Sequence, residues 1–132
     1  MFSGCEKLTE APELPATALA DSCYSSMFSE TGLTVAPVLP ATTLAKACYD
    51  GMFGYCNALT QAPALPATQL AERCYAFMFT RCKNLTGPVE LPAQQLPERC
   101  YGFMFDGCSK LNSVTCLATT MTGDFALGSW LE

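Results

Sequence analysis

The dipeptide Met-Phe recurs along this chain at a nearly constant interval. Successive copies lie 26, 25, 26 and 26 residues apart, at Met1-Phe2, Met27-Phe28, Met52-Phe53, Met78-Phe79 and Met104-Phe105. A fixed period of this size is typical of repeat proteins, in which each repeat buries its apolar face only by stacking on its neighbours. The period therefore predicts an array of similar, stacked units.

The repeat has the frame L-P-A-x-x-L-x-x-x-C-Y-x-x-M-F-x-x-C-x-x-L-T, in which apolar and small residues hold fixed places and charged residues vary. The unit that begins at Leu14 lacks the second cysteine and is one residue short, so we expect a distorted coil with a tighter turn around Gly32. We predict one leucine-rich-repeat domain over residues 1–132, with a partial repeat at 1–13, full repeats at 14–38, 39–64, 65–90 and 91–116, and a C-terminal edge or cap at 117–132.

Two segments of the repeat predict different secondary structures. Residues 59–65 should form a short extended strand, because proline lacks an N–H and disfavours a helical residue before it. Leu70, Cys74 and Met78 fall at i, i+4 and i+8, a one-sided apolar stripe that predicts a short helix over 70–79. A coil of about 26 residues lies within the usual range of leucine-rich repeats. We therefore expect an α/β leucine-rich-repeat solenoid with right-handed coils, each made of a short parallel strand and a short helix.

The runs of the form LPATxLAxxCYxxMFxxCxxLTxAP resemble the repeats of BspA-like leucine-rich-repeat surface proteins of host-associated bacteria. Leu65-Pro66 matches the strand end of that repeat, and the run from Met78 to Cys82 matches its helix. The likeness covers residues 1 to about 120, although the repeat is longer here and carries an additional Cys-Tyr. The resemblance implies an extracellular or cell-surface protein with an adhesive role, and it carries over no catalytic residues.

Charge and hydropathy disfavour two classes of partner. The net charge of −5 opposes binding to nucleic acid and to anionic membrane surfaces. The apolar runs are far shorter than the ~20 residues that span a bilayer, and no signal peptide is recognisable.

The chain opens in the middle of a repeat, so we expect it to be a fragment of a longer array.

Nine cysteines follow the repeat with one exception. Structural zinc is not expected, because the chain has no Cys-x-x-Cys pair and no histidine. The pattern favours buried free thiols that fill the core. One or two disulfides are the alternative, although equivalent side chains on stacked coils point in parallel, which is poor geometry for a bridge. Four cysteines precede tyrosine (Cys23, Cys48, Cys74 and Cys100), four close the Met-Phe-x-x-Cys run (Cys5, Cys56, Cys82 and Cys108), and Cys116 stands alone.

No catalytic pattern emerges from the residues. The lack of histidine excludes Ser-His-Asp and Cys-His nucleophile systems, and there is no Gly-rich phosphate loop. Acidic residues occupy different positions of the frame, so they predict no repeated carboxylate pair. We therefore expect neither an enzyme nor a cofactor. The Met, Phe and Tyr of the frame are interpreted as core ladders, with the tyrosine hydroxyls near water or a backbone partner.

A partner should contact the positions that vary between repeats. The predicted function is a non-catalytic cell-surface module that binds a host or bacterial surface protein or glycan, and the alternative is a structural spacer without a ligand. A repeat array that ends in an uncapped coil also favours end-to-end association of copies. Phe77 and Phe103 share one frame position and predict a small exposed patch, unless both rings lean into the groove between coils. The candidate ligand contacts are Glu10, Glu13, Gln61 and Glu90 on the strand face, and Phe77, Phe103 and Tyr55 on the helical face.

Overall fold

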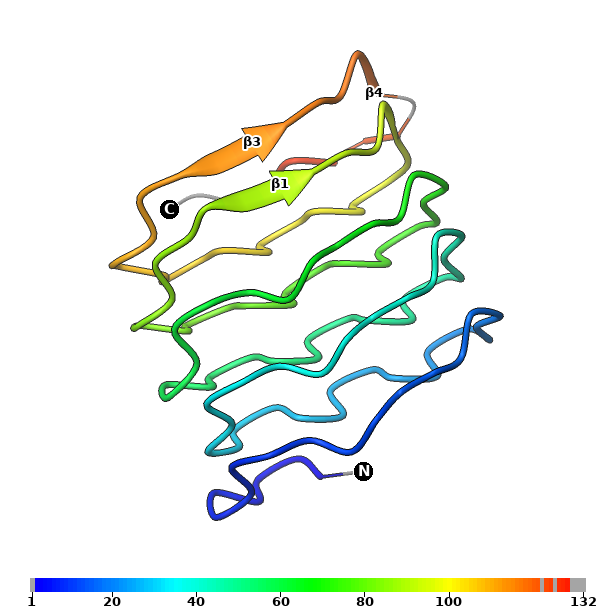
Figure 1. The fold of residues 1–132 in the computed structure, drawn as a ribbon. Coiled ribbons are helices and arrows are strands. Elements are labelled where there is room, and N and C mark those ends of the chain that lie inside the picture. Colours follow the sequence, from blue (N-terminus) through cyan, green and yellow to red (C-terminus); the bar gives the residue numbers. More distant parts are fainter. Residues whose placement is uncertain (1, 122, 125, 129–132) are drawn as a thin grey trace.

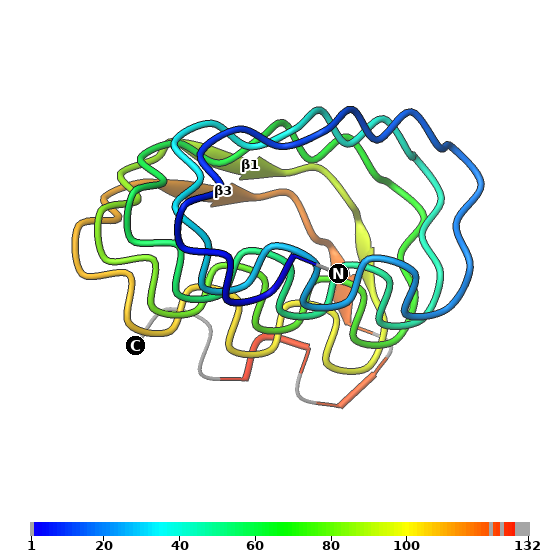
Figure 2. The ribbon, with the colours of Figure 1, turned by 90° about the horizontal axis from the view of Figure 1, so that it is seen from below.

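The chain winds through a stack of similar coils from its N-terminal to its C-terminal part (Figure 1). The computed structural model describes residues 2–121, 123–124 and 126–128. Seen from below, the coils overlap in one outline with a zigzag edge and an opposite, more extended edge (Figure 2). We call the zigzag edge the turn side and the other the proline side. The turn side comprises residues 20–30, 46–56, 72–82 and 98–108, and the proline side comprises residues 9–18, 34–43, 60–69, 86–95 and 112–121.

The prediction of an α/β leucine-rich-repeat solenoid is wrong, and so is the predicted helix over 70–79. Within the described ranges there is no helix, and strands occur only in two small parallel pairs. β1 pairs with β3, and β2 pairs with β4. The strands are β1 (Val89–Leu91), β2 (Gln95–Leu96), β3 (Val114–Cys116) and β4 (Thr120–Met121).

The turn side is held by two kinds of backbone hydrogen bond that alternate along the chain. One N–H closes a local turn, as where Met78 N donates to Tyr75 O at 3.2 Å. The next N–H leaves the coil, as where Phe79 N donates to Met104 O at 2.9 Å. Among the described residues, the inter-coil backbone bonds on this side run from the N–H of one coil to a carbonyl of the next coil along the chain. Half of the N–H groups therefore join neighbouring coils, and a helix cannot form because it would use all of them internally.

The turns require a left-handed backbone at every fourth residue. Ten non-glycine residues have a positive φ, between 51° and 62°, and Gly51 and Gly107 occupy two further places in the same series. A non-glycine residue in this region costs roughly 1–2 kcal/mol, so the inter-coil bonds and the packing must offset considerable strain. The i, i+4 spacing that predicted a helix belongs to this four-residue turn unit. The ten residues are Ser22, Ser26, Glu30, Ala47, Tyr55, Arg73, Phe77, Arg81, Arg99 and Phe103.

On the proline side, neighbouring coils form fewer backbone hydrogen bonds with each other. Between the earlier coils it has only isolated bridges in the described part of the chain, Glu10 with Val35 and Thr43 with Gln69. The longest pairing, β1 with β3, lies where valine replaces proline in the frame, and Val89 N donates to Ser113 O at 3.0 Å. Strands are therefore limited here by proline, which cannot donate to a neighbour.

Stacked side chains of one kind fill the core between the two sides. The phenylalanines of the frame form a continuous ladder, with ring centroids 5.7 Å apart between Phe53 and Phe79 and 5.8 Å apart between Phe79 and Phe105. Tyr49 and Tyr75 stack in a parallel ladder at 5.8 Å. All five of these rings are almost fully buried. The interpretation of the repeated aromatic residues as core ladders is therefore confirmed.

All nine cysteines are free thiols. Three of the Met-Phe-x-x-Cys cysteines, Cys56, Cys82 and Cys108, donate a hydrogen bond from sulfur to a phenylalanine carbonyl of the preceding coil, as where Cys82 Sγ lies 3.0 Å from Phe53 O. The first full coil has Thr31 at this position, and its hydroxyl donates to Phe28 O at 2.8 Å. A Cβ on the following residue, Gly32, would collide with the carbonyl oxygen of Glu6. The shortened repeat thus replaces the bond between coils by a bond within its own coil, and it needs glycine where two coils approach closely.

Candidate binding surface

The acidic and amide candidates on the proline side are exposed but are not brought together. Glu10 and Glu13 lie on the first coil, whereas Gln61 and Glu90 lie on two later coils. Between the two ends of this row, the side chain of Val38 is 78% exposed. The four residues therefore do not form one compact site.

The structure does bring Phe77 and Phe103 together, on the outside of the turn side. Their rings are parallel within 1°, and the centroids are 4.9 Å apart. The two residues are 37% and 41% exposed, in contrast to the buried phenylalanine ladder two residues further along each coil. The positive φ at both positions turns these side chains away from the core. Tyr55 is 49% exposed but belongs to a neighbouring row that also contains Arg81.

Arginines surround the exposed phenylalanine pair. The chain contains three arginines, and each lies four residues from one of the two phenylalanines in the left-handed series: Arg73, Arg81 and Arg99. Arg73 and Arg99 occupy equivalent places on neighbouring coils. These arginines were not among the predicted contacts, although the arginine before Cys-Tyr in two successive repeats was a usable signal.

A surface hollow of about 550 Å³ lies between the arginines and the phenylalanines. Its floor is made of two small residues, Ala76 and Gly102, which are buried. Small residues at this frame position leave space between the two rows of side chains, whereas the preceding coil has Asp50 there. The residues that line the hollow are Arg73, Ala76, Phe77, Arg99, Gly102, Phe103 and Gly128.

Ion pairs set the charge around the hollow. Arg73 Nη2 lies 2.7 Å from Asp50 Oδ2, and the Asp50 side chain is 16% exposed. Burial raises the pKa of Asp50, while the neighbouring Arg73 acts in the opposite direction. Arg99 Nε lies 3.8 Å from Glu98 Oε1, and both side chains are about half exposed. Arg73 is therefore held in place by a partly buried partner, whereas the Arg99–Glu98 pair is longer and more exposed.

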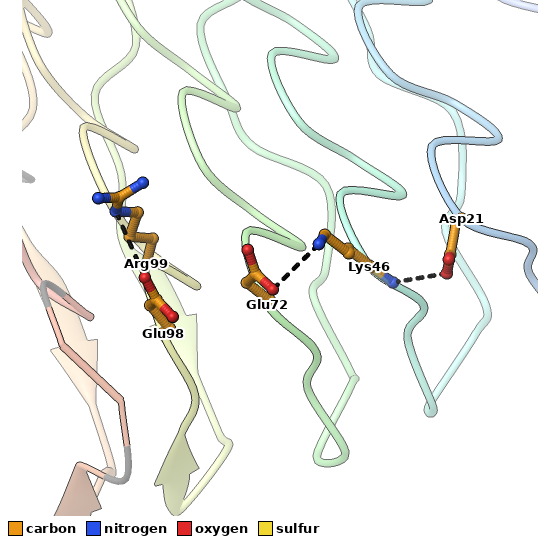
Figure 3. A network of polar contacts seen from close by, with 5 residues as sticks. All are labelled: Asp21, Lys46, Glu72, Glu98 and Arg99. Carbon is orange, nitrogen blue, oxygen red and sulfur yellow. Dashed lines mark hydrogen bonds and ion pairs between the residues drawn. The ribbon is translucent and has the colours of Figure 1, made fainter.

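A row of charged residues crosses successive coils of the turn side (Figure 3). Asp21 Oδ1 accepts a hydrogen bond from Lys46 N at 3.2 Å, and Lys46 Nζ lies 3.2 Å from Glu72 Oε2. Glu98 follows on the next coil, where it contacts Arg99. The row alternates in sign from Asp21 through Lys46 to Glu72, and it then places a second acid, Glu98, on the next coil.

The thiols do not offer a reactive nucleophile in the buried part of the turn side. Burial raises the pKa of Cys48 and of Cys108 to about 11, and that of Cys100 to about 12. Thiols with raised pKa values remain protonated near neutral pH and are poor nucleophiles. Among the described residues, no three acidic or thiol side chains are grouped so that they could hold a metal ion.

A search of the described residues finds no helix long and apolar enough to cross a membrane. Comparisons of the chain with models of protein families, with curated proteins and with solved structures find no match.

Proposed function

We propose that this chain is a non-catalytic binding module of a cell-surface protein, and that it contacts its ligand through the turn side. The observation that carries this proposal is the exposed, stacked pair Phe77–Phe103 beside a hollow lined by two arginines. Two aromatic rings held parallel outside the core do not contribute to the buried ladders. Aromatic residues and arginine are also the side chains most enriched at binding hot spots.

The proposed ligand is a surface protein or a glycan, and the cell-surface location follows from the resemblance of the repeats to those of bacterial surface proteins. A structural spacer without a ligand is the alternative. If the chain is a spacer, replacing Phe77 and Phe103 should change no binding. If it is a binding module, replacing them should abolish ligand binding.

The experiment is a screen of the folded chain against an array of glycans and purified surface proteins. The test variant is Phe77→Ser with Phe103→Ser, because Ser26 occupies the same row with the same left-handed backbone. The matched control is Val35→Ser with Val38→Ser, which removes the two most exposed valines from the proline side.

A ligand that is lost in the phenylalanine variant and retained in the valine variant supports the proposal. Retention in the first and loss in the second would place binding on the proline side and overturn it. A screen without any saturable ligand would favour the spacer.

A further inference from the structure

The hollow spans two successive coils and has the same chemistry on each. One wall is made of arginine side chains and the other of phenylalanine rings, so each coil contributes one of each kind. We call this surface the Arg–Phe groove, and it consists of Arg73, Arg99, Phe77, Phe103, Ala76 and Gly102.

The distance between the two Arg–Phe pairs favours linear ligands whose units repeat at the same distance. The phenylalanine centroids are 4.9 Å apart, which is close to the separation of about 4.8 Å between hydrogen-bonded neighbours in a stack. A polymer that lies along the groove meets an Arg–Phe pair at each step of this length. Side chains on one face of an extended peptide recur only every ~6.6 Å, so a peptide falls out of step with the coils. Linked sugar rings in an extended chain advance by nearly the coil spacing.

The charge of the groove indicates what each unit of the polymer should carry. Guanidinium groups bind planar anionic groups through paired N–H donors, and an apolar ring packs against the C–H face of a sugar. The Asp50 carboxylate already engages Arg73 at one end of the groove, which holds that arginine in place. Glu98 Oε1 lies 3.8 Å from Arg99 Nε, so an anionic ligand on Arg99 would have to lie beside this acid.

We propose that the Arg–Phe groove binds a linear acidic polysaccharide, with one carboxylate on each of two successive sugar rings. Each ring packs against one phenylalanine and presents its carboxylate to the arginine of the same coil. This inference rests on the proposed binding function and names the ligand class of the same site.

The probe is a set of galacturonic acid oligomers, measured by calorimetric titration of the folded chain at low salt. Methyl-esterified oligomers of the same length are the matched control, because each carboxylate is replaced by a neutral methyl ester on the same sugar chain. We expect saturable binding of the acidic oligomers that weakens as salt is raised, and at least tenfold weaker binding of the esters.

Three substitutions locate the binding. Arg99→Gln should weaken binding about tenfold, because one charge-assisted contact is lost. Arg81→Gln is the control, since Arg81 has the same exposed, left-handed position but does not line the groove. Glu98→Gln should strengthen binding several-fold, because it removes the acid beside the ligand carboxylate.

Equal effects of Arg99→Gln and Arg81→Gln would overturn the inference, because they would show diffuse charge attraction. Equal binding of poly-glutamate would also overturn it, since the coil spacing would then not select the ligand. If the oligomers fail to bind while an array ligand depends on Phe77 and Phe103, the ligand class is wrong and the proposed function stands. If nothing binds, both fail.

Discussion

The turn side and the proline side of each coil are built on opposite principles. The turn side satisfies its backbone by donating alternate N–H groups to the next coil, and it accepts strain at every fourth residue to do so. The proline side avoids left-handed non-glycine residues but leaves few donors, and in the described part of the chain its strands pair only at β1–β3 and β2–β4. The difference shows that a repeat protein can concentrate its cohesion on one side and leave the other free to vary.

Alkaline pH should have the largest effect on stability and should act through the turn side, because the buried thiols with raised pKa values lie there. Unfolded thiols ionise near pH 8.5, whereas folded Cys48 and Cys108 retain their protons up to about pH 11. The folded state thus binds more protons in this window, so its stability is complete below about pH 8.5 and falls as pH rises. The expected loss is about 1.4 kcal/mol per pH unit for each such thiol.

Urea unfolding under reducing conditions at about pH 8 and about pH 10 measures this loss. Replacing Cys48 and Cys108 by alanine should reduce the slope of stability against pH. A free energy of unfolding that stays constant across this range would contradict the burial of the thiols.

The next largest effect is expected from the phenylalanine ladder. Phe79→Ala should cost about 3–5 kcal/mol, because the ring is fully buried between two others and its loss leaves a cavity. Phe77→Ala, two residues earlier on the outward face, should cost less than about 1 kcal/mol. Chemical denaturation of both variants measures the difference. Equal costs would mean that Phe77 also belongs to the core.

A proline exchange tests why the proline side pairs so little. Val89→Pro removes the N–H that donates to Ser113 O and should cost about 1–3 kcal/mol. Pro63→Val, the reverse change at the same frame position one coil earlier, should be nearly neutral in thermal denaturation. A neutral Val89→Pro would show that β1 and β3 do not depend on this hydrogen bond.

Exchanging glycine and alanine on the turn side should give the smallest changes in stability. The two exchanges should act in opposite directions. Gly51→Ala should destabilise by about 1 kcal/mol, since φ is +64° and a Cβ would lie 3.1 Å from Ser26 Oγ. Ala47→Gly, four residues earlier in the same left-handed series, should stabilise by roughly 0.5 kcal/mol. Melting temperatures of the two variants are the readout, and shifts in the same direction would contradict the strain.

The sequence was a good guide to what is stacked and a poor guide to how the backbone is stacked. The Met-Phe period correctly predicted the buried ladders, because equivalent residues on stacked coils must share one environment. Leu70, Cys74 and Met78 predicted a helix because a helix and a four-residue turn unit produce the same i, i+4 spacing. Gly51 was the available contrary signal, since glycine inside a short helix is unfavourable.

The candidate site was predicted in part. Phe77 and Phe103 were named because they share a frame position, and the structure places them together on the surface. Arg73 and Arg99 were not named, because their approach to the phenylalanines depends on which residues have a left-handed backbone. At the last coil the register also differs from the frame: Leu91 pairs with Cys116, and Leu117 is 46% exposed. The frame aligned Leu117 with the buried leucines, and a shift of one residue turns it outward.

The one-way hydrogen bonding of the turn side has a consequence for assembly. Each coil presents donors on one face and acceptors on the other, so its peptide groups have a common polarity along the stack. Two copies that stack through their end coils can match these donors with acceptors only if the last coil of one copy meets the first coil of the other. A contact of this kind is heterologous and does not close into a symmetric dimer. A polymer of copies stacked in this way would therefore be polar, with two different ends.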